Sequence, residues 1–210
     1  MRSDTFDVRQ IFQERRQYVV PFYQRAYVWT LGNQWENLWL DIQAKADARL
    51  AGHALTPHFL GAIVVERQRA GLRGVDTYPV IDGQQRLTTL QYILTALQIA
   101  FREEGFTEYE ASIDECRLNP NPATMNDPEI ERHKVWPTFR DRTHHTTAVA
   151  ARRLDDLKAS FPTHFTQAGK LRSISIEHPP ALAAIWYFVE CIRDWLAKAG
   201  AEKARAAEVL

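Results

Sequence analysis

The sequence predicts an α+β fold, in which a small mixed sheet with flanking helices is followed by a helical subdomain. Up to about residue 100, short β-branched and aromatic runs alternate with stretches in which apolar residues recur every three or four positions. Prolines at positions 120, 122, 128 and 137 then mark a loop-rich boundary, and further helical patterns follow it. We therefore expect an α+β domain over residues 1–118 and a helical extension over residues 119–210.

The first elements are a short helix, a strand and a longer helix. Apolar spacing predicts the short helix over residues 8–12, and the run 18–21 predicts a strand that a proline ends. From Asn33 the apolar positions repeat at three and four, which predicts an amphipathic helix that ends before Gly52. We expect its two tryptophans, Trp35 and Trp39, to lie in the core.

A hairpin and a long helix are expected next. The runs 59–65 and 78–81 predict two strands, joined by a turn that contains Gly71 and Gly74. Directly after the second strand comes a polar junction, Asp82 to Arg86, and then a helical pattern over 87–101. A strand therefore feeds a helix through a short polar turn.

The second half is predicted to be helical. Apolar spacing outlines one helix over 150–161 and another over 182–196. Residues 201–210 remain helix-forming without a stop signal, so we expect the chain to be a fragment of something longer. We interpret the adjacent His144 and His145 as a solvated segment at the start of a helix.

Charge and cysteine content limit the functional class. The chain has 26 basic and 26 acidic residues, so a general affinity for polyanions or membrane surfaces is excluded. Twenty of the cations are arginines, which suits forked contacts with carboxylates or phosphates, although genome composition explains the bias equally well. Cys116 and Cys191 suggest neither a disulfide framework nor a zinc site, and no segment is apolar enough for export or a membrane span. A cytoplasmic protein without a membrane partner is expected.

The polar junction has the features of a phosphate site. Gly83 has no Cβ to hold a phosphate away, Gln84 and Gln85 offer first-turn amides, and Arg86 offers a guanidinium. Asp82 is a candidate ligand for Mg²⁺. Further hydroxyl donors lie one turn on, at Thr88 and Thr89.

The same junction also fits an ordinary helix start. Asp82 followed by Gln85 three residues later has the spacing of a capping box. A cap and an anion site are compatible, because the anion can bind other amides. Spacing does not separate the two hypotheses.

Residues 21–29 pack four aromatic side chains and one cation into nine positions. Flat rings beside an arginine are used to stack bases or to flank a sugar-phosphate backbone. The alternative is that alternate residues fill the core while Gln24 and Arg25 form internal hydrogen bonds.

Three blocks in this order resemble a known family. They are Val20-Pro-Phe-Tyr-Gln-Arg-Ala-Tyr-Val-Trp29, His58-Phe-Leu-Gly-Ala-Ile-Val64 and Val80-Ile-Asp-Gly-Gln-Gln-Arg-Leu-Thr-Thr-Leu90. Together they resemble the ParB/sulfiredoxin-like N-terminal domain, with its DGQQR motif, of the GmrSD and SspE anti-phage restriction proteins. The resemblance covers about residues 8–101 and, more loosely, the segment 134–142.

The resemblance implies a ParB-like nucleotide-binding domain in the first half, with a sensor of modified phage DNA. It implies hydrolysis of a nucleoside triphosphate, GTP or UTP rather than ATP, with Mg²⁺. The implied mark on the DNA is a phosphorothioate or a glucosylated base. The resemblance is also compatible with a homo-oligomer. Relatives carry a C-terminal HNH-type nuclease domain, which is absent from this chain, so cleavage is not assigned to it.

Carried over by position, the resemblance assigns roles to two segments. Asp82, Gln84, Gln85 and Arg86 are the expected catalytic residues, and Asp82 is the expected metal ligand. The expected nucleotide contacts are Gly83, Gln85, Arg86, Thr88 and Thr89. The expected contacts with the nucleotide or the DNA mark are Tyr23, Gln24, Arg25 and Tyr27.

In the mechanism we expect, Mg²⁺ bridges phosphate oxygens near Asp82, and Arg86 neutralises charge at the γ-phosphate. Gln84 or Gln85 positions the attacking water. The alternative is a non-catalytic module that binds nucleotide or DNA phosphate and relays its occupancy. A third hypothesis, that this half is itself a nuclease, requires folding to bring Asp41 or Glu66 beside the junction.

Overall fold

The computed structural model describes residues 3–54, 56–172 and 177–210. A four-stranded sheet has the order β2-β3-β1-β4. β1 pairs in parallel with both β3 and β4, whereas β2 pairs antiparallel with β3. The bounds of the strands are Arg16–Val19 for β1, Val64–Val65 for β2, Asp76–Asp82 for β3 and Val135–Trp136 for β4. The predicted α+β class with a small mixed sheet is confirmed.

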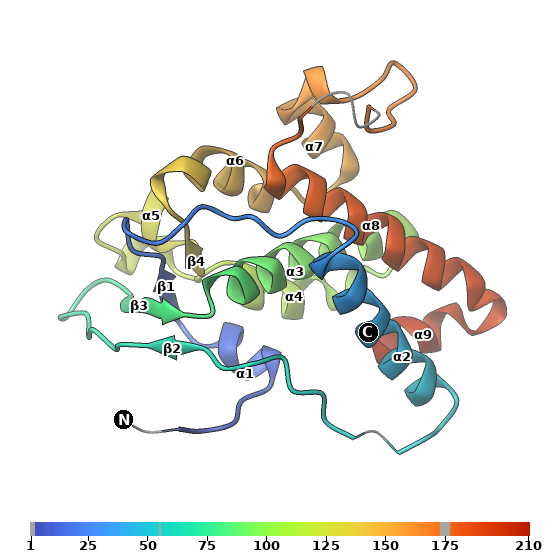
Figure 1. The fold of residues 1–210 in the computed structure, drawn as a ribbon, viewed down its shortest axis with the longest axis horizontal. Helices are drawn as coiled ribbons and strands as arrows, with labels where there is room; N and C mark the ends of the chain where they lie inside the picture. Colours follow the sequence, from blue (N-terminus) through green and yellow to red (C-terminus); the bar gives the residue numbers. More distant parts are fainter. Residues whose placement is uncertain (1–2, 55, 173–176) are drawn as a thin grey trace.

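Helices pack beside the sheet, and loops connect them (Figure 1). Their bounds are Val8–Gln13 for α1, Gln34–Leu50 for α2, Glu110–Arg117 for α4, Pro128–Glu131 for α5, Leu154–Ser160 for α7 and Lys203–Val209 for α9. The three that carry most of the packing argument are α3 at Gln84–Glu104, α6 at Phe139–Ala150 and α8 at Pro180–Lys198. No described helix combines the length and the apolar character that crossing a bilayer requires.

Most of the predicted elements of the first half are confirmed, with shifted ends. The helices at the start of the chain and after Asn33 are present, and both tryptophans of α2 are buried. The predicted strand 59–65 is wrong for most of its length, because β2 holds only Val64 and Val65. Phe59 is instead 81% exposed. The residues between Phe59 and β2 run past the start of α3, where the Ala62 carbonyl accepts a hydrogen bond from Arg86.

The second half differs more from the prediction. The predicted helix over 150–161 is confirmed in its later part as α7, Leu154–Ser160, but it does not begin at Ala150, where α6 ends. The predicted helix over 182–196 is confirmed within α8. The solvated-segment interpretation is correct for His144, which is exposed, and wrong for His145, which is fully buried in α6. The ring of His145 lies against Tyr92, and its Nδ1 is 3.2 Å from the Tyr92 hydroxyl. One histidine of this polar stretch is therefore part of the protein interior.

Two hydrophobic cores share α3. The smaller lies between the sheet and α3, and the larger joins α2, α3, α6, α8 and α9. α3 packs along α8, as the central position of α3 in Figure 1 suggests. β4 belongs to residues 119–210, yet it pairs with β1. The division after residue 118 stays a prediction, and both the sheet and the larger core draw residues from either side of it.

Candidate functional site

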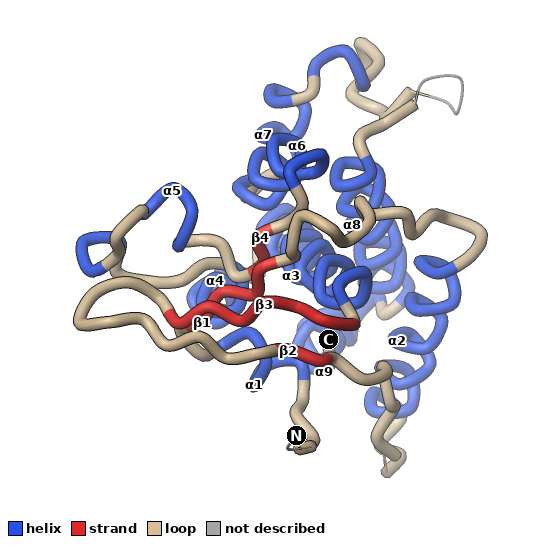
Figure 2. The backbone as a smooth tube through the Cα atoms, turned by 60° about the vertical axis from the view of Figure 1, so that its left-hand side comes forward, coloured by secondary structure: helices blue, strands red, loops and turns tan. Residues whose placement is uncertain are grey.

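Three parallel strands end at the same edge of the sheet. β3, β1 and β4 run in one direction, so the loops that follow them converge beyond their carboxyl ends (Figure 2). In sheets with parallel strands this edge is where ligands usually bind. The converging segments are residues 20–29, residues 83–86 with the start of α3, and residues 137–142 with the start of α6.

Gly83 connects β3 to α3 and explains why a glycine is needed there. Its φ is +93°, in the region that side chains disfavour. A Cβ would also lie 3.0 Å from the Ala62 carbonyl oxygen and 3.1 Å from the Ile63 Cα atom. The missing side chain is thus already required by the neighbouring backbone.

The first turn of α3 has no side-chain cap. Asp82 is the last residue of β3, and its carboxylate does not accept a hydrogen bond from the helix start, so the capping-box hypothesis is wrong. The carboxylate instead faces Arg86 at 3.5 Å. The first bond of the helix runs from the Leu87 amide to the Gly83 carbonyl, at 3.0 Å. The amides before Leu87 therefore remain donors at the positive end of a 21-residue helix.

Gln84 and Gln85 have different environments although both are 7% exposed. The Gln85 side chain accepts from the Val28 amide at 2.9 Å and donates to the Ala26 carbonyl at 3.1 Å. It therefore ties the aromatic segment to α3. The Gln84 side chain makes no hydrogen bond with any residue that the structure describes. Of the two, Gln84 has an uncommitted amide.

Arg86 is held in place but keeps free donors. Its Nη2 donates to the Ala62 carbonyl at 2.6 Å, and its guanidinium passes over Gly61, where a Cβ would come within 3.2 Å. Its side chain is 30% exposed, and its Nε is buried without a partner among the described residues. An arginine fixed on one side by a carbonyl presents its remaining N–H groups in a set direction.

Thr88, Thr89 and Tyr27 are buried, at 4%, 0% and 6% exposed. A chain of hydrogen bonds runs from Trp35 Nε1 to the Tyr27 hydroxyl at 2.8 Å, then to Thr89 Oγ1 at 2.6 Å and on to the Gln85 carbonyl at 2.8 Å. Burial raises the pKa of Tyr27. In this conformation these side chains fix the start of α3 and do not face solvent.

The aromatic segment contains both core and surface residues. Phe22 is 92% and Tyr23 69% exposed, with their ring centroids 5.5 Å apart, and Arg25 is exposed as well. Gln24 instead donates to the Ile81 carbonyl at 2.9 Å. The core alternative thus describes Gln24 and Tyr27, whereas Phe22, Tyr23 and Arg25 are exposed.

Sequence reasoning missed the loop after β4. Phe139, 81% exposed, and Arg140, also exposed, begin α6 at the same edge. The Arg142 guanidinium lies 4.7 Å from the centre of the Trp136 ring. The Asp141 carboxylate accepts from the Tyr27 amide at 2.9 Å, which joins this loop to the aromatic segment. A sequence signal for this site was available, because residues 135–142, like residues 80–87, read as a strand followed by a short turn and a helix.

The fit of the site to Mg²⁺ depends on Asp82. Its side chain is 69% exposed, and only one of its oxygens faces Arg86. A magnesium ion bound with a triphosphate needs one or two carboxylates and otherwise keeps its waters. A single exposed carboxylate beside an uncapped helix start fits that requirement.

The described residues contain no group of three or more histidine, cysteine or acidic side chains arranged to hold a metal ion. Asp41 pairs with His58, and Glu66 follows β2 alongside Pro79, three residues before Asp82. Neither joins Asp82 in such a group. The nuclease hypothesis therefore has no acidic cluster in the part of the chain that is described.

A comparison with known families decides the relationship. Residues 8–179 match the family described as GmrSD restriction endonuclease, N-terminal domain. The chain belongs to this family. Membership supports a role in anti-phage restriction, and the match extends well past the first half, through α6 and α7. No curated protein matches the GmrSD-family chain in sequence.

Proposed function

We propose that this chain is the nucleotide-hydrolysing and DNA-sensing part of a restriction system that acts against phage DNA in the cytoplasm. The observation that carries the proposal is the uncapped start of α3, where free amides, Arg86 and an uncommitted Gln84 meet at the carboxyl edge of parallel strands. A helix start of this kind favours anions, and the family supplies the restriction context.

The triphosphate binds with its terminal oxygens at the first turn of α3. Arg86 donates its unused N–H groups to the oxygens on which charge develops as the bond to the γ-phosphorus breaks. Gln84 orients the attacking water, because Gln85 already uses both ends of its amide on the backbone. Asp82 would hold Mg²⁺, which would supply charge neutralisation beside the phosphates. GTP or UTP is the proposed substrate.

The exposed aromatic and basic side chains at the same edge are the proposed DNA contacts. Phe22, Tyr23 and Arg25 follow β1, and Phe139 and Arg140 follow β4. Rings beside arginines suit a sugar-phosphate backbone with a phosphorothioate, or a glucosylated base. Because Gln85 and Asp141 both bind the segment 26–28, occupancy of one loop is transmitted to the other. The proposed receiver is an HNH-type nuclease domain.

The second candidate is a binding module without catalysis. One observation favours it: Gln85 and Thr89 are used in holding the fold, which leaves few groups for chemistry. Such a module would bind nucleotide or DNA phosphate at the same turn and lose affinity steeply with salt.

Phosphate release from GTP, UTP, ATP and CTP with Mg²⁺ separates the two. Wild type is compared with Arg86→Ala and with Arg69→Ala, an exposed arginine on the hairpin between β2 and β3. We expect turnover to fall by about two orders of magnitude or more in Arg86→Ala and to stay unchanged in the control. Phosphorothioate-containing duplex is expected to stimulate the wild type. Tight nucleotide binding without release would favour the module.

A further inference from the structure

Two histidines that the proposed function does not use face each other between α7 and α8. His164 ends the 3₁₀ helix Pro162–His164, and His178 lies two residues before the start of α8. Their Nδ1 atoms are 3.0 Å apart, and both side chains are partly buried. The segment that follows α7 lies at the top of Figure 1, away from the sheet.

The hydrogen bonds of His178 fix which of its ring nitrogens carries the hydrogen. Its Nε2 lies 3.0 Å from the Arg172 carbonyl oxygen, and a carbonyl only accepts, so Nε2 is the donor. In the neutral ring the Nδ1 atom then has a lone pair. Histidines that bind metal ions usually donate their other ring N–H to a carbonyl or carboxylate in this way.

The backbone of Arg172 holds both histidines. Its amide donates to the His164 carbonyl at 2.9 Å, while its own carbonyl accepts from the His178 ring. The His164 ring also packs edge to face against Phe161, with the ring centroids 6.3 Å apart. The two Nδ1 atoms are therefore brought together by several contacts besides the one between the rings.

His164 supplies the second nitrogen. In the hydrogen-bonded pair its Nδ1–H donates to the lone pair of His178. Its Nε2 has no hydrogen-bond partner among the residues that the structure describes, so the proton can move there through solvent and leave a lone pair on Nδ1. Burial, with smaller contributions from His178 and His144, lowers the pKa of His164 and so keeps its ring neutral at physiological pH.

The spacing of the two nitrogens fits a shared transition-metal ion. Imidazole nitrogens bind Zn²⁺ at about 2.0–2.1 Å, so two of them on one ion lie about 2.9–3.4 Å apart when the angle at the metal is about 90–110°. The distance of 3.0 Å between the Nδ1 atoms lies within that range. Hard ions such as Mg²⁺ prefer oxygen ligands and do not suit this pair.

We propose that His164 and His178 form a binding site for a divalent transition-metal ion, with Zn²⁺ as the expected ion. Their two Nδ1 atoms are the protein ligands, and water or a group from outside the chain fills the remaining positions. The bound ion links the end of the 3₁₀ helix after α7 to the residues before α8. This site is independent of the proposed nucleotide site, whose Mg²⁺ would lie at Asp82.

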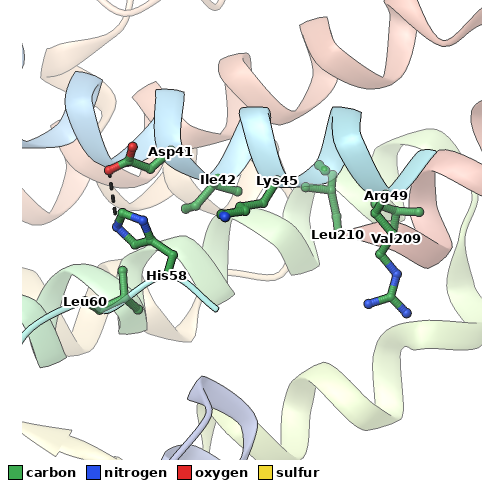
Figure 3. Close-up of a pocket in the computed structure, with 9 residues that line it drawn as sticks. Asp41, Ile42, Lys45, Arg49, His58, Leu60, Val209 and Leu210 are labelled. Atoms are coloured by element: carbon green, nitrogen blue, oxygen red, sulfur yellow. Dashed lines mark ion pairs between the residues drawn. The ribbon is translucent and has the colours of Figure 1, made fainter. Parts of the chain in front are cut away.

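A second pair of side chains, His58 and Asp41, serves as the comparison. His58 Nε2 lies 3.4 Å from Asp41 Oδ2, and the two side chains point toward each other (Figure 3). The other ring nitrogen of His58 has no hydrogen-bond partner in the described part of the chain, so no carbonyl sets its tautomer. We expect this pair to bind a transition metal more weakly than the two histidines do.

Calorimetric titration of the full chain with ZnCl₂ or NiCl₂ at neutral pH tests the site. Wild type should bind about one ion per chain at this pair, and an excess of MgCl₂ should not compete. His164→Asn and His178→Asn should each weaken Zn²⁺ affinity about tenfold or more. His58→Asn and His53→Asn, which changes an exposed histidine elsewhere, should leave the affinity unchanged.

Thermal unfolding provides a second readout that allows for variants of lower basal stability. An ion that binds only the folded chain raises its Tm, so Zn²⁺ should raise the Tm of wild type, His58→Asn and His53→Asn. It should not raise the Tm of His164→Asn or His178→Asn above that of the same variant without metal. No Zn²⁺ binding by wild type, equal affinity in wild type and His164→Asn, or a loss confined to His58→Asn would overturn the inference.

Discussion

Gln85 and Val28 lie 57 positions apart and are joined by a hydrogen bond of 2.9 Å from the Val28 amide to Gln85 Oε1. The Nε2 of the same Gln85 side chain donates to the Ala26 carbonyl. One side chain of the strand-to-helix turn thus holds the aromatic segment in register. This relationship separates the two glutamines, one used in the fold and one free for chemistry.

Gln84→Leu and Gln85→Leu should therefore have opposite effects. Gln85→Leu leaves the Val28 amide and the Ala26 carbonyl without their partner, so the free energy of unfolding should fall by about 1–3 kcal/mol. Gln84→Leu should change stability by less than about 1 kcal/mol while lowering turnover by about two orders of magnitude. Urea unfolding and phosphate release, measured on both variants, check this. Equal turnover in Gln84→Leu and wild type would remove Gln84 from the mechanism.

Gly83→Ala should destabilise the protein more than a matched glycine change at the other end of α3. Gly83 and Gly105 both have positive φ, +93° and +87°, but only Gly83 has backbone within 3.1 Å of a would-be Cβ. Gly105→Ala should cost about 1 kcal/mol for its backbone strain alone. Gly83→Ala adds displacement of the 62–63 backbone and should cost about 2–4 kcal/mol. Similar losses in both variants, measured by urea unfolding, would contradict the role of that close approach.

Stability should fall in mild acid because of buried histidines. Burial lowers the pKa of His145 to about 3 and that of His133 to about 4. Since an unfolded histidine titrates near 6.5, the unfolded chain binds the extra protons first. The stabilisation is complete above about pH 6.5 and is lost as the pH falls from there toward the folded-state values. Each histidine contributes a slope of about 1.4 kcal/mol per pH unit within that window.

The neighbouring pair His144 and His145 provides the control for this pH effect. His145→Gln should reduce the slope of the free energy of unfolding between pH 6 and pH 5 by about one proton. His144→Gln changes an exposed side chain and should leave the slope unaltered. The slope, not the absolute stability, is compared, because His145→Gln also changes packing against Tyr92. A slope unchanged in His145→Gln would mean that His145 is protonated in the folded protein.

The α+β class, the hairpin and the helix after Gly83 were predictable because their apolar periods are local. The strand 59–65 was predicted too long. Its first residues instead form an extended segment that contacts the start of α3, and no local sequence pattern specifies that contact. Two residues depart in opposite directions from the rule that apolar side chains are buried and polar ones exposed: His145 is buried, and Phe139, at the carboxyl edge, is exposed. Phe139 lies at the carboxyl edge of the sheet because β4 pairs with β1 across more than 110 residues, and sequence spacing does not reveal that pairing.

DNA binding at this edge should respond differently to Arg140→Ala and Phe139→Ala. If Arg140 neutralises one phosphate, its removal should lower the slope of log affinity against log salt by about one. Phe139 contributes stacking without charge, so Phe139→Ala should weaken binding about tenfold at every salt concentration with the slope unchanged. Arg69→Ala, at the distant hairpin, should alter neither. Titrations of a phosphorothioate-containing duplex at several salt concentrations measure both quantities. A slope that falls equally in Arg69→Ala would place the DNA elsewhere on the surface, because it would no longer distinguish the carboxyl edge from the opposite end of the sheet.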